Sequence, residues 1–130
     1  MRRRLPRPTD TEVAILRVLW TNGPSTVRQV HDTLAESRES ETGYTTTLKL
    51  MQLMTEKGLL LRDASTRTHV YTARVPEQQT QRLLVADLVD RAFEGSAAAL
   101  VMQALAARPI TAEQLKELRQ LIKDEEESRK

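Results

Sequence analysis

The stretch from Gly43 to Gly58 constrains the fold more than any other part of this chain. Leu50, Met51 and Met54 recur at a spacing that places them on one face of a helix. A glycine after the last apolar position is typical of a helix C-terminus, because glycine adopts the left-handed conformation without steric strain. We therefore predict an amphipathic helix that ends at Gly58.

The opposite face of this predicted helix carries Thr45, Thr46, Lys49 and Gln52. Hydroxyl, ammonium and amide groups suit DNA phosphates and base edges. The first carboxylate in the stretch is Glu56. Taken alone, the pattern fits either a DNA-recognition helix or an ordinary solvated helix with three adjacent threonines, and the flanking segments decide between the two.

Two further helices are predicted before this stretch. The first begins at a capping box formed by Thr9 and Glu12 and ends at the turn of residues 22–24. The second follows a cap at Ser25 or Thr26. Its apolar positions recur at helical spacing at Val27, Val30 and Leu34. Both helices therefore have one face to bury.

The segment after Gly58 predicts a two-stranded β-hairpin. Residues 59–63 precede a polar turn, and residues 68–74 alternate so that His69 and Tyr71 share one face. Arg67 falls near the tip of this hairpin. Three helices followed by a hairpin form a winged helix-turn-helix, in which the third helix enters the major groove of DNA.

Residues 76–130 predict three helices, which begin at Pro76, after a cap at Ser96 and after a capping box at Thr111. The first runs to Gly95, and Arg108-Pro109 breaks the second. Their apolar stripes exceed what a unit of this size buries by itself. Because exposed stripes of this extent usually mark an interface, we expect the helices to pair with a second copy. The residues expected at or near the seam are Leu84, Leu88, Leu100, Val101, Leu118 and Ile122.

The expected fold is thus mainly α-helical with one small β-hairpin. We divide the chain into a flexible basic arm at residues 1–8, a winged-helix DNA-binding domain at 9–75 and a helical dimerisation region at 76–130. Residues 1–75 carry 12 Lys or Arg against 8 Asp or Glu, whereas residues 76–130 carry 8 against 10. A basic front half favours a nucleic-acid partner. Arg2 to Arg4 either assist DNA contact or belong to a solvated tail.

Composition excludes several classes of site. The absence of cysteine rules out disulfides, thiolate metal sites and a cysteine nucleophile, and it fits a reducing, cytoplasmic location. No apolar run approaches the ~20 residues of a membrane span. His31 and His69 are too isolated to argue a metal site, and His31 fits a plain boundary histidine. We expect no enzymatic activity, metal or cofactor, because no nucleophile, base and orienting group can be assembled.

Seven short motifs occur in an order that resembles one protein family. They are Glu12…Leu19-Trp20, Gly23-Pro24…Val27-Arg28-Gln29-Val30, Tyr44-Thr45-Thr46-Thr47-Leu48, Glu56-Lys57-Gly58-Leu59-Leu60, Arg67-Thr68-His69-Val70-Tyr71, Phe93-Glu94-Gly95-Ser96 and Leu115-Lys116-Glu117-Leu118. Over roughly residues 9 to 123, the chain resembles the penicillinase repressor family of winged-helix transcriptional repressors.

The resemblance implies a homodimer that binds a dyad operator with TACA-like half-sites in double-stranded DNA and represses neighbouring genes. It also implies, for several members, that a membrane metallopeptidase sensor leads to cleavage of the repressor in its dimerisation region. Aligning on Leu100-Val101 places Gln103 and Ala104 at the Asn-Phe bond that is cut in the β-lactam-responsive branch. The cysteine cluster of the copper-responsive branch is absent.

We expect Thr45, Thr46, Lys49 and Gln52 to face the DNA groove, and Arg28, Arg62 and Arg67 to anchor phosphates. Members of the family often carry an arginine where this chain has Leu53 and Gly-Arg where it has Thr66-Arg67. Base preference and wing shape are therefore expected to differ from theirs. Two alternatives stay open: a winged helix that binds only proteins, which salt-sensitive DNA binding would exclude, and a ligand-sensing regulator.

Overall fold

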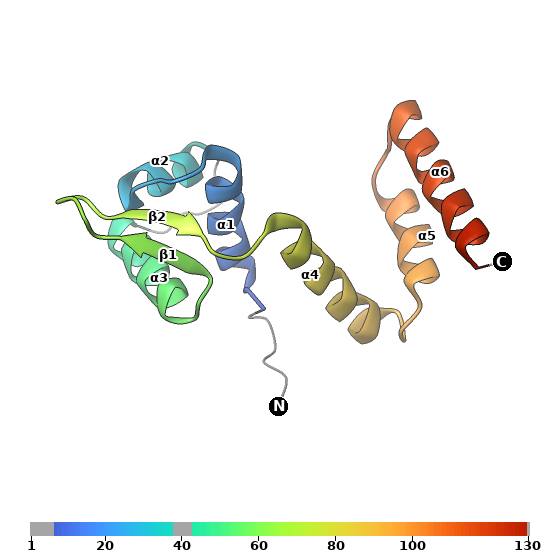
Figure 1. Cartoon of the computed structure of the whole chain (residues 1–130), viewed down its shortest axis with the longest axis horizontal. Coiled ribbons are helices and arrows are strands. Elements are labelled where there is room, and N and C mark those ends of the chain that lie inside the picture. Colours follow the sequence, from blue (N-terminus) through green and yellow to red (C-terminus); the bar gives the residue numbers. More distant parts are fainter. Residues whose placement is uncertain (1–6, 38–42, 130) are drawn as a thin grey trace. The chain divides into compact units, whose positions relative to one another are not determined.

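The computed structural model describes residues 7–37 and 43–129 (Figure 1). Its elements in chain order are α1 (Asp10–Asn22), α2 (Val27–Ser37), α3 (Tyr44–Glu56), β1 (Leu60–Asp63), β2 (Val70–Ala73), α4 (Glu77–Ala92), α5 (Ala97–Ala107) and α6 (Ala112–Ser128). The mainly helical fold with one hairpin is confirmed. Arg2 to Arg4 of the expected arm lie outside the described residues.

The chain divides into two compact units, Met1–Val85 and Ala86–Lys130, and the division falls within α4. The first unit holds the winged helix-turn-helix, formed by α1, α2, α3 and the β1–β2 hairpin. The second holds the remainder of α4 with α5 and α6. The functional limits expected at residues 8 and 75 stay a prediction.

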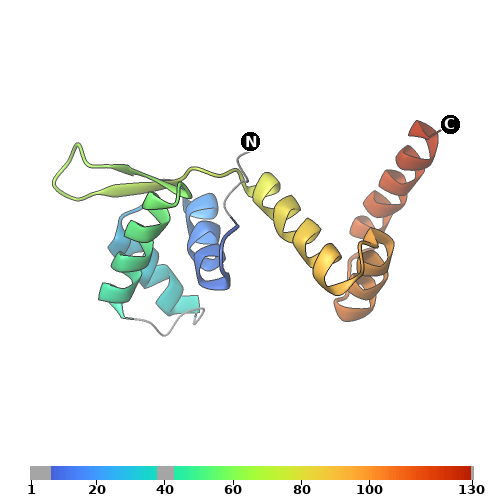
Figure 2. The same cartoon turned by 90° about the horizontal axis from the view of Figure 1, so that it is seen from below.

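Three helices and the hairpin enclose the hydrophobic core of the first unit (Figures 1 and 2). Each helix contributes the apolar face that its sequence spacing predicts. The buried side chains are Ile15, Leu16, Val18, Leu19, Val27, Val30, Leu34, Met51, Met54, Leu59, Leu60 and Tyr71. Leu50 lies at the edge of this core and is only partly buried. The position of α3 is therefore fixed by packing on its inner face.

The start of α2 shows which of two candidate caps is used. The backbone N–H of Gln29 donates to Thr26 Oγ1 at 3.2 Å, and the Thr26 N–H donates to Gln29 Oε1 at 2.9 Å. Thr26 therefore caps the helix. Ser25 instead exchanges backbone hydrogen bonds with Tyr71 at 3.0 and 2.8 Å, which attaches the entry of α2 to β2.

The turn at Gly58 leads α3 directly into β1. Gly58 has a φ of +86°, its N–H donates to Thr55 O at 3.1 Å, and the Leu59 N–H donates to Met54 O at 2.9 Å. This pair of bonds is the Schellman arrangement, which glycine favours because it carries no Cβ. Met54 and Leu59 are both fully buried beside the turn. The predicted end of α3 at Gly58 is thus confirmed.

β1 and β2 pair antiparallel, with Leu60 opposite Ala73 and Arg62 opposite Tyr71. Because side chains alternate along a strand, Leu60, Arg62 and Tyr71 share one face of the hairpin. Leu60 and Tyr71 are buried in the core, whereas Arg62 is exposed nearer the tip. We call the hairpin and its turn, residues 60–73, the wing.

A partly buried ion pair connects the start of α1 to the end of α3. Lys57 Nζ lies 2.8 Å from Glu12 Oε2, and the Glu12 side chain is almost fully buried. Burial alone would raise the pKa of Glu12. Hydrogen bonds from Lys57 and Thr9, together with the Lys57 charge, outweigh that effect and hold the pKa below its ordinary value. Glu12 is therefore charged in the neutral range.

The chain that leaves the wing is attached to α1. Trp20 Nε1 donates to Val75 O at 2.9 Å, across 55 residues of sequence. Pro76 follows, and α4 begins at Glu77, as the sequence predicts. Thr80 is buried, and its hydroxyl donates to Pro76 O at 2.8 Å. The first turn of α4 thus belongs to the compact first unit.

Within the second unit, α4 ends at Ala92, three residues earlier than the Gly95 expected from the sequence. Glu94 and Gly95 have φ values of +49° and +82°, so a left-handed turn replaces the last expected helical turn. The predicted cap at Ser96 and the predicted capping box at Thr111 are both present. Sequence signals therefore locate these helix starts better than the end of α4.

Neither α5 nor α6 contains a buried residue. Among the residues of the second unit that the structure describes, Val89 alone is buried. Several large apolar side chains are well exposed, including Leu121 at 61% and Ile122 at 56%. Over residues 7–37 and 43–129, no helix is both long and apolar enough to cross a membrane.

Candidate nucleic-acid interface

The outer face of α3 presents the polar residues that the sequence predicts there. Thr45, Thr46, Lys49 and Gln52 are all exposed. On the opposite side of the helix, Met51 and Met54 are fully buried. The helix is therefore held by its apolar face while hydroxyl, ammonium and amide groups point away from the core.

The third of the adjacent threonines has a structural role. Thr47 is buried, its hydroxyl donates to Gly43 O at 3.4 Å, and His31 Nδ1 lies 3.2 Å from the same hydroxyl oxygen. His31 is half-buried and links α2 to α3, as expected of a boundary histidine. Only Thr45 and Thr46 of the three threonines remain available to a ligand.

Arg28 lies over the first residue of α3. Its guanidinium carbon is 4.3 Å from the centre of the Tyr44 ring, a cation–π contact between α2 and α3. The His31 ring meets the same tyrosine edge-on, with ring centres 5.9 Å apart. Because a guanidinium is planar, this stacking orients the Arg28 N–H groups while leaving its edges open.

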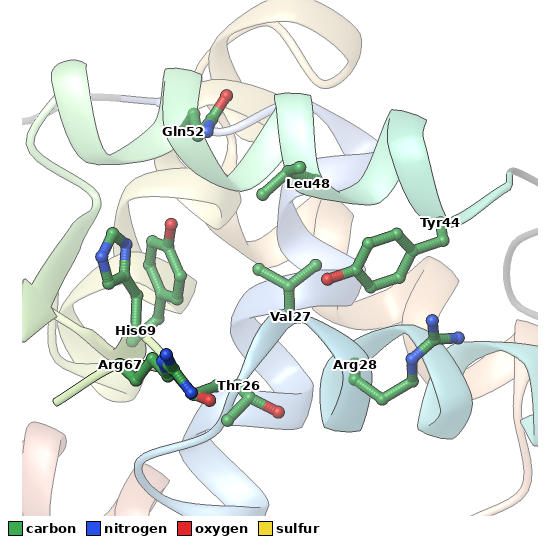
Figure 3. A pocket seen from close by; sticks show the side chains of 10 residues that line it. Thr26, Val27, Arg28, Tyr44, Leu48, Gln52, Arg67 and His69 are labelled. Atoms are coloured by element: carbon green, nitrogen blue, oxygen red, sulfur yellow. The ribbon is translucent and has the colours of Figure 1, made fainter. Parts of the chain in front are cut away.

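A pocket of about 280 Å³ lies among α2, α3 and the wing (Figure 3). The start of α2 contributes Thr26, Val27 and Arg28, and α3 contributes Tyr44, Leu48 and Gln52. The wing contributes Arg67, Thr68, His69 and Tyr71. We call this the wing pocket. It brings together three of the predicted DNA-contact residues, namely Arg28, Gln52 and Arg67.

The turn of the wing is organised by its own polar groups. The Ser65 N–H donates to Asp63 Oδ1 at 2.9 Å, and the Thr66 hydroxyl donates to Thr68 O at 2.7 Å. Hydrogen bonds from Ser65 lower the pKa of Asp63, so its carboxylate keeps its charge in the neutral range. The turn that carries Arg67 is therefore shaped locally.

The other predicted contacts are exposed outside the wing pocket. Thr45, Thr46 and Lys49 occupy the outer face of α3, and Arg62 lies on β1. Leu53 interrupts this polar surface as an exposed leucine, 45% accessible. The predicted residues thus form one pocket group and one outer-face group on neighbouring elements.

Sequence reasoning missed several residues of the wing pocket, notably Tyr44 and His69. Two signals pointed to them. Tyr44, Leu48 and Gln52 are four residues apart, which places them on one stripe of α3. His69, just before β2, alternates with buried Tyr71 on one face of the wing. In the described part of the chain, no cluster of three acidic or histidine side chains could hold a metal ion.

Comparison with known proteins identifies the family. The model of the penicillinase repressor family matches residues 8–124. This chain belongs to the penicillinase repressor family. The resemblance seen in the sequence motifs is thereby confirmed, and it extends over both compact units.

Two kinds of relative illustrate the match. Transcriptional regulator BlaI from two strains of Mycobacterium tuberculosis is 38% identical over 69 residues, which cover 52% of this chain and 49% of that protein. The chain thus spans about half the length of these mycobacterial relatives. A penicillinase repressor from Bacillus licheniformis is 22% identical over 129 residues, 98% of each chain.

In this member of the penicillinase repressor family, the expected seam residues differ in exposure. Leu88, Val101 and Ile122 are exposed. Leu84, Leu100 and Leu118 are half-buried, and Leu84 belongs to the first unit. The most exposed of these positions is Ile122 on α6, at 56%.

The bond aligned with the family's cleavage position lies within α5. Gln103 and Ala104 are both exposed. Ala104 is still part of the helical hydrogen-bond pattern, because its carbonyl accepts from the Arg108 N–H at 3.2 Å. A protease that requires an extended substrate would have to unwind this helix first.

Proposed function

We propose that this chain is a transcriptional repressor whose dimer binds a dyad operator in double-stranded DNA. The observation that carries the proposal is the outer face of α3. Its exposed Thr45, Thr46, Lys49 and Gln52 lie on a buried, well-packed helix whose only carboxylate is the terminal Glu56. The family membership supports a repressor, and the surface supports DNA as the ligand.

In this proposal α3 enters the major groove. Thr46 and Lys49 meet base edges or phosphates from the middle of the helix. Arg28 and Arg67 bind the backbone on either side of the wing pocket, and Arg62 adds a contact along the wing. Because the core positions α3, base contacts depend on packing rather than on the loops.

The same proposal assigns α5 and α6 to dimerisation. Their lack of buried residues leaves apolar surface that a second copy would cover. A two-fold dimer places recognition helices on successive faces of the major groove, ~10 base pairs or a multiple apart. Once one half-site is bound, the second contact becomes intramolecular, which raises the affinity for the full operator.

Relief of repression follows from the same arrangement. Cleavage between Gln103 and Ala104 would separate α6 from the DNA-binding unit and so remove the avidity. Both residues are exposed, and a helix without buried side chains unwinds locally at little cost. The resemblance to the family supplies the proposed source of the signal, a pathway that begins at a membrane metallopeptidase sensor.

The test is titration of the full chain against duplexes selected from a random library, at several salt concentrations. Each phosphate neutralised steepens the plot of log K against log salt by about 0.9. We expect a slope of several such units and a two-fold symmetric selected sequence. Failure to bind any duplex in a salt-dependent manner would contradict the proposal and favour a winged helix that binds only proteins.

A further inference from the structure

We propose that the wing pocket seats one phosphodiester of the DNA backbone, and that His69 binds it as an imidazolium, so that DNA affinity increases as pH falls. This inference rests on the proposed DNA-binding function and adds a titratable contact to it. Its starting observation is that His69, Arg67 and Arg28 line one pocket from two separate elements (Figure 3).

The groups around the wing pocket are those that bind a phosphate. Arg28 and Arg67 supply guanidinium N–H donors, which match phosphate oxygens in geometry and charge. The Thr26 hydroxyl accepts from the Gln29 N–H, which leaves its own proton free to donate to a ligand. The volume of about 280 Å³ is just below the roughly 300–1,000 Å³ of sites for drug-sized ligands, as suits a smaller group such as one phosphodiester.

A stacking contact orders the Arg28 side of the wing pocket. Arg28 lies over the Tyr44 ring at 4.3 Å, so its guanidinium is held beside the pocket before DNA arrives. A pre-ordered group loses less side-chain entropy on binding than a free one. Arg67 and His69 belong to the wing, whose turn is shaped by the Thr66 and Asp63 hydrogen bonds.

Charges around His69 favour an anion. None of the ten described lining residues is acidic; the ionisable ones are Arg28 from α2, Tyr44 from α3, and Arg67 and Tyr71 from the wing. Arg62 shares the His69 face of the wing and is also cationic. The carboxylates on the same elements, none of them in the lining, are Asp32, Glu36, Glu56 and Asp63.

Phosphate binding and imidazole protonation are therefore coupled. Imidazoles ordinarily titrate near pH ~6.5, within the physiological range. A bound phosphate carries a negative charge, which favours the charged form of an imidazole that contacts it. Binding of DNA should consequently take up a proton at His69.

His31 is the only other histidine of the chain. Its Nδ1 lies 3.2 Å from the Thr47 hydroxyl, and its ring meets Tyr44 edge-on. It does not line the wing pocket. His31→Gln therefore serves as the matched control for His69→Gln, because each variant removes one of the two imidazoles.

The experiment measures the salt dependence of DNA affinity at about pH 5.5 and about pH 7.5, using the full chain and a duplex selected by the wild type. For the wild type and His31→Gln, we expect the slope of log K against log salt to steepen by up to about 0.9 at the lower pH. His69→Gln should show the same slope at both pH values. His69→Lys should retain the steeper slope at both.

A second arm identifies the phosphate. Replacing backbone phosphates one at a time with uncharged methylphosphonate should abolish the pH effect of the wild type at one position per half-site. A pH effect that persists with every singly substituted duplex would overturn the assignment to the DNA backbone, because no single backbone phosphate would then account for it.

The outcomes separate this inference from the function on which it rests. Absence of any salt-dependent DNA binding would refute the proposed function itself. Salt-dependent binding with a slope that does not change with pH, or an equal pH effect in His69→Gln and the wild type, would overturn the role of His69 alone. Unchanged thermal midpoints of the His69 variants would confirm that folding is not the cause, since this side chain is exposed.

Discussion

The first unit buries most of its large apolar side chains, whereas the α5–α6 segment buries none. In the winged helix, leucines and methionines of three helices are buried together with the hairpin. In α5 and α6 every described residue is exposed or only partly covered. The same residue types therefore stabilise a monomeric core in one region and remain available for association in the other.

The contrast extends to charge. The first unit exposes Lys49, Arg62 and Arg67 around its recognition surface. The last turns of α6 carry the acidic run from Asp124 to Glu127. DNA attracts the first kind of surface and repels the second. This contrast supports the proposal that the first unit contacts DNA and that the apolar surface of the second mediates association.

The largest effect should come from a cavity in the core. Leu16→Ala removes a fully buried side chain and should lower the free energy of unfolding by about 2–5 kcal/mol. Leu121→Ala, the matched control in α6, should change it by less than about 0.5 kcal/mol at protein concentrations too low for two copies to associate. Urea unfolding at constant protein concentration, followed by Trp20 fluorescence, measures both variants. An equal loss in the free energy of unfolding for both variants would contradict the difference between the two regions.

Lys49→Ala tests the recognition surface without touching the core. If Lys49 meets a base, discrimination at one base pair should fall by roughly 1–3 kcal/mol. If it meets a phosphate, the salt slope should fall by about 1 for every duplex. Lys116→Ala on α6 should leave DNA titrations unchanged. Wild-type affinity of Lys49→Ala for all duplexes would remove this residue from the interface.

The ion pair of the first unit should make its stability depend on pH. Glu12→Gln should cost about 1–2 kcal/mol at neutral pH, since it weakens charged hydrogen bonds to a half-exposed lysine. The folded-state pKa of Glu12 is lowered, so its contribution is complete above the unfolded value of ~4.3 and is lost as pH falls through the folded value.

The difference in urea midpoint between the wild type and Glu12→Gln should therefore shrink below about pH 4. Asp10→Asn changes an exposed carboxylate in the same helical turn and should cost much less. A difference that stays constant down to about pH 2 would show that the charge of Glu12 is not what stabilises the contact.

Arg67→Ala should have the smallest effect. Because Arg28 also lines the wing pocket, loss of the Arg67 contact should reduce the salt slope by at most about 0.9. The unfolding midpoint should stay the same, because Arg67 is exposed in the wing turn. A marked loss of stability with intact DNA affinity would instead make Arg67 a structural residue of the wing.

Local signals made most of the fold predictable. Capping boxes at Thr9 and Thr111, the cap at Ser96 and the glycine after α3 specify helix ends through bonds that span only a few residues. The alternation of apolar residues likewise predicts the buried faces. Such signals operate within one element, so they are visible in the sequence without knowledge of packing.

The wing pocket was not predictable in the same way. Arg28 stacks on Tyr44 across 16 residues, and Lys57 pairs with Glu12 across 45. These contacts depend on how α1, α2 and α3 pack, which helical spacing does not specify. The outer face of α3 was predicted, because it follows from periodicity alone, whereas the grouping of Arg28, Gln52, Arg67 and His69 required the packed structure.

We propose that the exposed apolar surface of the C-terminal helices pairs two copies and thereby sets DNA affinity. The most direct measurement is analytical ultracentrifugation combined with titration of full and half operators. It compares the wild type with Ile122→Asp, which would bury an unpaired carboxylate in the seam. Gln120→Glu is the control, because it adds the same charge two positions away on α6.

We expect the wild type to be a dimer at micromolar concentration and to bind the full operator more tightly than a half-site. Ile122→Asp should sediment as a folded monomer and lose that preference, while Gln120→Glu should behave like the wild type. A wild-type monomer at micromolar concentration, or a monomeric Ile122→Asp that binds the full operator as tightly as the wild type, would contradict the account.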